Sequence, residues 1–326
     1  MFHIILKLSL ILFIIFPVSA KAEWFFFSDT AMTTAIELEM WSEDAAVAKK
    51  ISKKVFAEFK RIDQSMSRYQ PSSALSKVNR IAALEPVIVS GELFRLIQKS
   101  TELSTLSSGA FDITFASLGY LYDFRAAKQP SKKNIDKQLS RVNFHNILLD
   151  ETLSTIAFKQ DGVLLDLGGI AKGYAVDLGV TILQENGVSH ARLSAGGDMR
   201  LLGDKKSKAW MIGIKDPRNE AKHAVILPLS GVAISTSGDY ERFFIDEAGE
   251  RVHHILSPKT GRPVKGIQSV SVIGPDAITT DGLSTAIFVL GVEQGLALIE
   301  SLPAVDVIII DADRQMHFST GLMSPD

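Results

Sequence analysis

The sequence predicts an α+β fold, in which helices and strands are segregated along the chain rather than alternating regularly. Two observations support this class. Beyond Gly162, short runs of strand-forming residues dominate, and only two clear helical patterns interrupt them. The phosphate-binding patterns GxGxxG and GxxxxGKS/T are both absent, so the sequence does not indicate a doubly wound nucleotide-binding sheet.

Composition and charge exclude several kinds of protein and site. The chain has 326 residues, of which 46% are hydrophobic and none is cysteine. There is enough apolar material for a sizeable core, whereas a disulfide scaffold, a zinc–thiolate site and a cysteine nucleophile are excluded. The 35 Lys plus Arg and 37 Asp plus Glu give a formal net charge of −2. This balance supplies no global positive field, so we expect no nucleic acid partner.

The N-terminal segment, residues 1–22, is typical of a cleavable signal peptide. Lys7 precedes an apolar stretch from Leu8 to Phe16, and the triplet Ala20-Lys21-Ala22 forms a small-residue cleavage signal. The stretch is too short to span a bilayer, although an uncleaved membrane anchor is the alternative. We therefore expect export to the periplasm without a lipid anchor, because there is no cysteine to carry one, and a single domain over residues 23–326.

The first half of that domain begins with a strand and continues with helices. Residues 35–41 alternate, so Ile36, Leu38 and Met40 should face the core and Glu37 and Glu39 the solvent. Next, Ser42 should cap a helix whose buried stripe is Val47, Ile51, Val55, Phe59 and Ile62. A second helix is predicted from about Ser90 to Leu106, ending at Gly109. The Lys-rich segment 128–141 is expected to be a solvated helix rather than a basic binding face.

The second half contains the short strand patterns. Helices are predicted over 170–186, ending at Gly187, and from about Thr280 past Gly291. The expected strands cover 163–167, 190–195, 209–214, 224–229, 242–246, 269–273 and 305–311.

A glycine-rich corner joins the first of these strands to its helix. Gly168 and Gly169 would let a ligand approach the backbone, and the amides that open the helix carry partial positive charge. Lys172 adds a full charge, so a phosphate fits this corner. A purely structural strand-to-helix corner is the alternative. The pair Gly196-Gly197, followed by Asp198, could likewise bind a polar group or cap a turn.

Two further patterns could carry chemistry. Asp281 and Thr285 lie four residues apart on one predicted helix face and could offer two oxygens to one cation, and Mg²⁺ prefers oxygen ligands. The alternative is an acid that complements the helix dipole beside an ordinary threonine. His253 and His254 are adjacent, and because alternate residues of a strand face opposite sides, at most one of them points into a site.

In chain order, these pieces resemble the ApbE-type flavin transferases, the FAD:protein FMN transferases, over nearly the whole mature chain. Eight ordered motifs carry the resemblance, which makes a chance match improbable. They are Ala31 to Thr34, Ile62 to Tyr69, Ser73 to Asn79, Gly109 to Thr114, Asp166 to Asp177, Ala195 to Asp198, Thr236 to Tyr240 with His253 to Ile255, and Asp281 to Ala286.

The resemblance implies a Mg²⁺-dependent transfer of FMN from FAD to a Ser or Thr hydroxyl of a membrane-associated redox protein, with release of AMP. It places His254 as general base. It implies that the metal is bound by Gly169, Asp281, Ser284 and Thr285. The implied FAD contacts are Met32, Tyr69, Ala110, Phe111, Asp112, Lys172 and Ile255.

Two departures from the family's pattern bear on activity. Ser257 stands where the family usually has Asp, and a missing carboxylate could leave the histidine without an orienting partner. Thr33 replaces the usual glycine and could crowd the approach beside Met32. Two alternatives therefore stay open: a Mg²⁺-dependent FAD pyrophosphatase that yields FMN and AMP, and a periplasmic protein that binds FAD without catalysis.

Overall fold

The computed structural model describes residues 22–323, and helices and strands are mixed in it as the α+β class requires. The predicted signal peptide lies outside the described residues except for Ala22.

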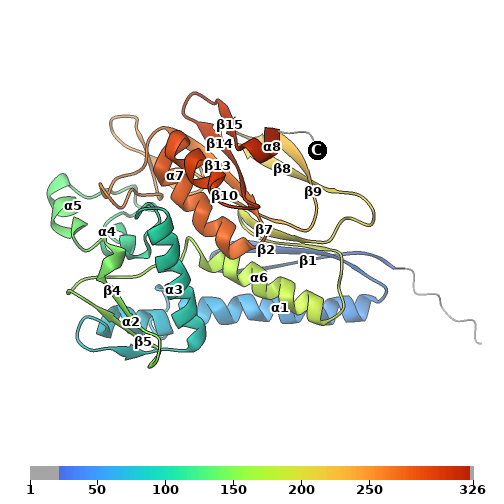
Figure 1. Cartoon of the computed structure of the whole chain (residues 1–326), viewed down its shortest axis with the longest axis horizontal. Helices are drawn as coiled ribbons and strands as arrows, with labels where there is room; N and C mark the ends of the chain where they lie inside the picture. The colour runs from blue at the N-terminus through green and yellow to red at the C-terminus, as the bar shows by residue number, and fades with distance from the viewer. Residues whose placement is uncertain (1–21, 324–326) are drawn as a thin grey trace, which may run out of the picture.

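A large antiparallel sheet forms the centre of the described chain (Figure 1). Its eight strands lie in the order β1 (Glu23–Ala31), β2 (Thr34–Ser42), β6 (Ala191–Ala195), β7 (Asp198–Leu202), β10 (Ala233–Gly238), β13 (Ile267–Gly274), β14 (Asp306–Asp311) and β15 (Met316–Phe318). Each neighbouring pair of strands is antiparallel. Where two neighbours in the sheet also follow one another in sequence, as β1 and β2 or β6 and β7 do, a short hairpin connects them.

Three long helices cover one face of this sheet: α1 (Ala45–Met66), α6 (Ala171–Glu185) and α7 (Ala277–Glu300). The hairpin of β8 (Trp210–Asp216) and β9 (Asn219–Leu229) covers part of the other face and buries Trp210, Ile212 and Ile214. By length and composition α7 could cross a membrane, but in the described chain it packs against α6, β10 and β13.

A second group of elements lies at the opposite end of the molecule from β1 (Figure 1). It contains a small sheet in the order β3-β5-β4, the helix α3 that packs on α7, and several short helices. The bounds are α2 (Ala74–Ile81), β3 (Val87–Ile88), α3 (Gly91–Leu106), η1 (Ile113–Phe115), α4 (Ala116–Gly119), α5 (Lys132–Leu139), η2 (Phe144–Asn146), β4 (Ile147–Asp150) and β5 (Thr155–Phe158). The remaining elements are β11 (Phe243–Ile245), β12 (Arg251–His253) and α8 (Thr320–Met323).

The predicted strand at 35–41 is present as β2, with one face assigned wrongly. Ile36, Leu38 and Met40 are buried as expected. Glu39, predicted to face solvent, is also buried, and its carboxylate pairs with Lys205 at 2.7 Å and Arg192 at 3.5 Å. The reason is that the second face of the sheet is covered here too, and a buried carboxylate needs opposite charge beside it.

Two details predicted for the helix α1 are wrong. Asp44, not Ser42, caps α1, because its carboxylate accepts hydrogen bonds from the amides of Ala46 and Val47. Val47 is 48% exposed and does not belong to the buried stripe. By contrast, the helix predicted from about Ser90 to Leu106 is confirmed as α3, and the solvated helix is confirmed as α5.

The predicted strand at 163–167 is wrong, because these residues form no strand. The helix predicted from Thr280 begins three residues earlier, at Ala277, and bends at Gly291, whose φ of 82° interrupts the helical conformation.

One carboxylate joins the three helices α1, α3 and α6. Glu92 of α3 accepts hydrogen bonds from both terminal nitrogens of Arg61 in α1, at 2.8 and 2.6 Å, and from the hydroxyl of Tyr174 in α6 at 2.9 Å. The bonds from Arg61, and then that from Tyr174, hold the pKa of Glu92 below its ordinary value of 4.5.

We therefore predict that Glu92→Gln destabilises the fold by about 1 kcal/mol at neutral pH. Because the folded pKa lies below 4.5, this stabilisation is present above pH 4.5 and is lost as pH falls through the folded value. Denaturant unfolding of both proteins from pH 7 to pH 3 measures the difference. Asp136→Asn, which breaks the exposed pair with Lys132, is the control and should change little. An equal effect of Glu92→Gln at pH 3 and pH 7 would contradict the assignment.

Candidate functional site

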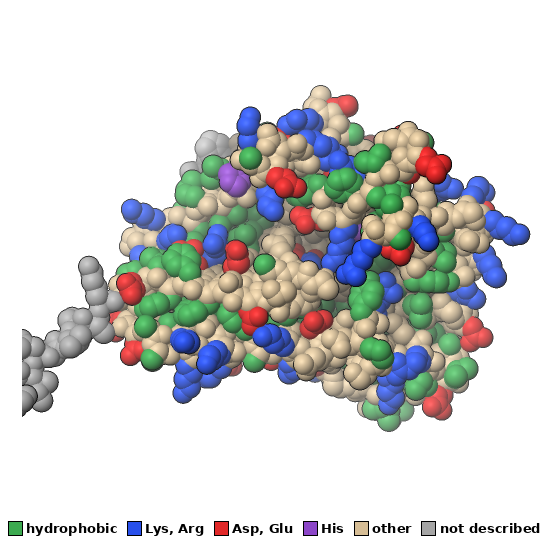
Figure 2. All heavy atoms as spheres, turned by 180° about the vertical axis from the view of Figure 1, so that it is seen from behind, with side chains coloured by type: hydrophobic (Ala, Val, Ile, Leu, Met, Phe, Trp, Pro, Cys, Tyr) green, Lys and Arg blue, Asp and Glu red, His purple; other side chains and the backbone are tan. Residues whose placement is uncertain are grey.

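A cavity of about 430 Å³ opens between the helices α1, α6 and α7 and the loops near β10 and β12. The face in Figure 2 is hollowed near its centre and carries interspersed acidic and basic side chains. All but one of the residues that the resemblance implied line the cavity: Met32, Tyr69, Ala110, Phe111, Asp112, Gly169, Lys172, His254, Ile255, Asp281 and Thr285. Ser284 does not line it.

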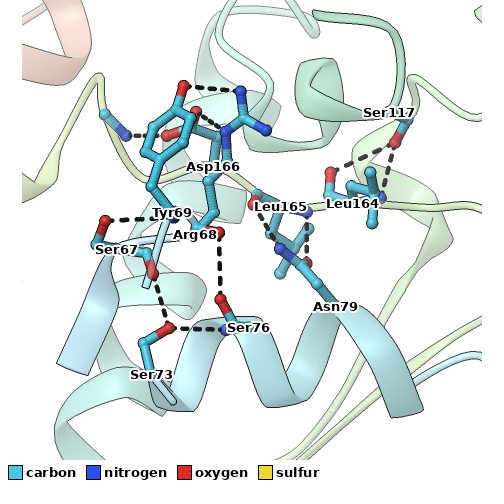
Figure 3. Close-up of polar contacts among 11 residues, drawn as sticks. Ser67, Arg68, Tyr69, Ser73, Ser76, Asn79, Ser117, Leu164, Leu165 and Asp166 are labelled. Atoms are coloured by element: carbon cyan, nitrogen blue, oxygen red, sulfur yellow. Dashed lines mark hydrogen bonds and ion pairs between the residues drawn. The ribbon is translucent and has the colours of Figure 1, made fainter. Parts of the chain in front are cut away.

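Side chains, rather than a neighbouring strand, hold the segment that leads to the glycine corner (Figure 3). The amide of Asn79 in α2 donates to the carbonyl of Leu165 at 3.0 Å and accepts from its N–H at 2.8 Å. Ser117 accepts from the N–H of Leu164 at 2.8 Å. These bonds satisfy backbone groups that a sheet would otherwise pair, which explains why a strand-like sequence lies outside any sheet.

Directly after this segment, Asp166 connects the corner to the cavity rim. Its carboxylate accepts from the N–H of Gly168 at 2.8 Å and from Nε of Arg68 at 2.6 Å. The guanidinium of Arg68 lies 4.3 Å from the ring centroid of Tyr69 and donates to its hydroxyl at 2.8 Å. Tyr69 is 68% exposed, so these contacts orient a ring that burial does not fix. Arg68 and Asp166 both belong to the family motifs, but no sequence pattern predicts a contact between residues 98 positions apart.

The N-terminal turn of α6 places a lysine between two carboxylates. Nζ of Lys172 makes a short ion pair with Asp198 and lies 3.6 Å from Asp281. Burial alone would lower the pKa of Lys172, but the two carboxylates outweigh it and raise the pKa, so the ammonium stays charged. Burial and the charge of Asp198 raise the pKa of Asp281. The sequence had left the role of Asp198 open, and the structure makes it the closest partner of Lys172.

The residues expected to hold a metal lie on α7 and at the glycine corner. A side chain at Gly169 would stand 3.3 Å from Oγ1 of Thr285, so the absence of one lets these two residues meet. Asp281 is one helical turn before Thr285 on the cavity side. Ser284 is buried and its hydroxyl contacts Ser237 of β10 at 2.8 Å. Residues 22–323 hold no cluster of three or more His, Asp or Glu side chains arranged for a metal.

The stretch Ala110 to Asp112 forms another wall of the cavity. The carboxylate of Asp112 accepts from the N–H and hydroxyl of Thr114, at 2.8 and 2.6 Å, and from the N–H of Phe144 at 2.8 Å. Burial raises the pKa of Asp112. This side chain therefore caps η1 while it lines the cavity.

Only one of the two adjacent histidines lines the cavity. His253 is buried, and its Nε2 contacts the carbonyl of Val264 at 2.8 Å while Nδ1 accepts from the N–H of Ile255 at 3.3 Å. His254 lines the cavity, and burial together with the charge of Arg242 lowers its pKa to about 3. The imidazole of His254 is therefore neutral at physiological pH. Its buried Nδ1 has no hydrogen-bond partner among the described residues.

Of the two residues that depart from the family's pattern, only one lines the cavity. Ser257 does not line the cavity, although its neighbours Leu256 and Pro258 do, and its carbonyl accepts the N–H of Gly261 to close a turn. Thr33 does line the cavity, in the two-residue turn between β1 and β2. Met32 and Thr33 both have positive φ, 53° and 61°.

Comparison with known proteins finds similar sequences in one family. The sequence model of the ApbE family matches residues 32–309. Proteins named FAD:protein FMN transferase from Klebsiella pneumoniae and Treponema pallidum are each 33% identical to the chain. The first alignment covers 90% of this chain and 91% of the relative, and the second covers 82% and 79%.

Solved structures give the same result. The ApbE protein of Thermotoga maritima superposes with a TM-score of 0.85 at 32% identity, covering 92% of this chain and 98% of that one. The flavin transferase ApbE of Vibrio cholerae superposes with a TM-score of 0.83 at 27% identity, covering 93% and 99%. The resemblance and the α+β fold expected from the sequence are confirmed.

The role of Asn79 leads to a prediction. Asn79→Leu keeps the number and branching of the side-chain heavy atoms but leaves the N–H and carbonyl of Leu165 without partners, and should destabilise the fold by about 2–3 kcal/mol. Denaturant unfolding measures this cost. Lys77→Leu, on the exposed face of the same helix, is the matched control and should have little effect. If the two variants were equally stable, the amide of Asn79 would not be the support of the glycine corner.

Proposed function

The chain belongs to the ApbE family, and we propose that it transfers FMN from FAD to a Ser or Thr hydroxyl of an acceptor protein through a phosphoester bond, releasing AMP. The observation that carries the proposal is the convergence of a carboxylate, a hydroxyl, a lysine and a neutral histidine on one cavity. These are Asp281, Thr285, Lys172 and His254. Transfer from a pyrophosphate needs a cation near the phosphates and a base for the attacking hydroxyl.

In the proposed reaction, the hydroxyl oxygen of the acceptor attacks the phosphorus of the FMN half of FAD. The bond from that phosphorus to the bridging oxygen breaks, and the electron pair leaves with AMP. His254 accepts the hydroxyl proton, which its neutral imidazole allows. The ammonium of Lys172 opposes the negative charge that builds on the phosphate oxygens.

The donor set suits Mg²⁺. Asp281, Thr285 and the backbone of Gly169 supply a carboxylate, a hydroxyl and a carbonyl, all of them oxygen ligands, and substrate phosphates commonly complete such a shell. The close approach of Gly169 to Thr285 supports this set. When bound, Mg²⁺ would neutralise charge on the phosphoryl oxygens. Ser284, whose side chain bonds within the protein, would contribute only through its backbone carbonyl.

FAD would be held by the remaining cavity residues. Tyr69, oriented by Arg68, offers an exposed ring for the isoalloxazine, and Met32 and Phe111 offer apolar surface. Ala110, Asp112 and Ile255 complete the proposed contacts.

A second candidate is FAD hydrolysis, or FAD binding without transfer. Two observations favour it. The buried Nδ1 of His254 has no partner among the described residues, and Ser257 stands where the family's pattern has an acid. An imidazole without an orienting partner would be a poorer base. Water in place of the acceptor hydroxyl would then yield FMN and AMP.

The cellular setting is part of the proposal. We expect residues 23–326 to act as one domain in the periplasm after cleavage of the signal peptide. The acceptor would be a flavoprotein subunit of a membrane-associated redox complex that presents its Ser or Thr in a short exposed segment.

The decisive experiment incubates residues 23–326 with FAD and Mg²⁺, with and without an acceptor domain, and follows AMP release and acceptor mass together. Transfer predicts that the acceptor gains the mass of FMN only with metal present. AMP release without a mass gain supports hydrolysis, and FAD binding with neither product supports a binding protein. In either of those cases Ser257→Asp tests whether a restored carboxylate brings transfer back.

We predict that Asp281→Ala lowers metal-dependent AMP release by about 10²-fold or more. The loss follows because one of the proposed metal ligands is removed. Stabilisation of the protein by Mg²⁺ in thermal unfolding should disappear as well. Asp281→Asn keeps an acceptor for the N–H of Gly173, which Asp281 binds at 3.0 Å, and so controls for lost structure. Wild-type rates at limiting Mg²⁺ in both variants would rule out the metal assignment.

For His254→Ala we predict near-normal FAD affinity with transfer slowed by about 10²–10⁴-fold. Since the pKa of His254 is about 3, the base form is lost only at pH values near 3. The wild-type kcat/KM should therefore show no fall due to this group between pH 8 and pH 5. A large loss of FAD affinity in the variant would instead make His254 a binding residue.

A further inference from the structure

Three basic side chains line the cavity: Arg68, Lys172 and Arg242. Arg68 is paired with Asp166, and Lys172 lies between Asp198 and Asp281. Within residues 22–323, Arg242 alone of the three makes no ion pair, although Glu241, its neighbour in the chain, also lines the cavity. Its guanidinium donates one hydrogen bond, from Nη2 to the hydroxyl of Thr33 at 2.9 Å. The other donors of the fork are therefore available to a ligand.

The hydroxyl that positions Arg242 belongs to a strained turn. Met32 and Thr33 form a two-residue turn with positive φ at both positions, a conformation usually taken by Asn and Gly. A β-branched residue such as Thr33 is an outlier in this region. The N–H of Met32 donates to the carboxylate of Asp63 at 3.2 Å. The turn is thus held at one residue by α1 and at the next by Arg242.

The backbone of Arg242 is tied to the proposed base. Its carbonyl accepts the N–H of His254 at 3.1 Å. The positive charges of Arg242 and Lys172 both contribute to the lowered pKa of His254. Arg242 is exposed at the cavity mouth, whereas Lys172 is half-buried in it.

We propose that Arg242, positioned by the hydroxyl of Thr33, is a phosphate-binding residue at the mouth of the cavity and contacts the pyrophosphate of the dinucleotide. A planar guanidinium with free N–H groups binds two phosphate oxygens at once. Lys172 is paired with carboxylates, whereas Arg242 makes no ion pair in the described chain, so its guanidinium adds a second positive charge that a phosphate can bind.

The role rests on the proposed function and adds to its chemistry. When the acceptor oxygen bonds to the FMN phosphorus, the bond to the bridging oxygen breaks and its electron pair stays on the AMP phosphate, while the proton passes to His254. Negative charge thereby builds on the oxygens of the FMN phosphate during the attack and remains on the AMP phosphate after the bond breaks. Arg242 stabilises the charge on one of these two phosphates. Separate measurements of FMN and AMP binding distinguish which one.

The test is a binding cycle with FAD, AMP, adenosine, FMN and riboflavin, measured calorimetrically in Mg²⁺ for the wild type, Arg242→Gln and the control Arg125→Gln. Arg125 is exposed and does not line the cavity. We expect Arg242→Gln to weaken FAD and either AMP or FMN by about 10-fold or more. Its effect on adenosine and riboflavin, which lack phosphate, should be small, and Arg125→Gln should leave all five ligands unchanged.

Two variants at position 33 test how Arg242 is positioned. Thr33→Val removes the hydroxyl and keeps the branched shape, so it should reproduce part of the loss, whereas Thr33→Ser keeps the hydroxyl and should not. Thermal unfolding of each variant detects any loss of the fold itself.

Specific results would overturn the inference without touching the proposed function. Equal affinity of wild type and Arg242→Gln for FAD, AMP and FMN would exclude a phosphate contact. Equal losses for AMP and adenosine, or for FMN and riboflavin, would make the role structural. Failure of the wild type to bind FAD would instead contradict the proposed function.

Discussion

The close approach of α6 and α7 at Gly173 is the contact on which the site depends. A side chain at position 173 would meet the carbonyl of Ala277 at 2.1 Å, so only glycine allows the two helices to lie this close. The N–H of Gly173 donates to Asp281, and Asp177 of α6 accepts from the amides of Ala277 and Ile278 at the start of α7. The first turns of the two helices are therefore joined, which places Lys172 of one beside Asp281 of the other.

The charged side chains at the inner end of the cavity differ from those at its rim. At its inner end, Lys172 is outweighed by Asp198 and Asp281, so this cluster of three groups carries a net negative charge when both acids are ionised. Burying such a cluster is costly unless it is compensated, and a divalent cation would supply the compensation. At the rim, Arg68 orients Tyr69, and Arg242 presents a positive charge without a carboxylate partner in the described chain.

The support of the glycine corner shows how distant parts of the sequence combine. Residues 163–167 have the composition of a strand, and local reasoning assigned them to one. Asn79 and Ser117, which lie 86 and 47 residues before the backbone groups that they bind, take the place of a neighbouring strand. No periodicity in a sequence reveals a hydrogen bond of this kind, because the donor and acceptor share no local pattern.

The sequence by itself determined the α+β class, the helix α3 and, through the resemblance to a known family, eleven of the residues that line the cavity. It could do so because residue periodicity and short motifs are local properties of the chain. Tertiary structure alone decided the burial of Glu39, the pairing of Lys172 with Asp198, the low pKa of His254 and the contact of Thr33 with Arg242, 209 positions apart. Charge, burial and hydrogen bonding depend on what the fold brings into contact, and that is not written in the spacing of residues along the chain.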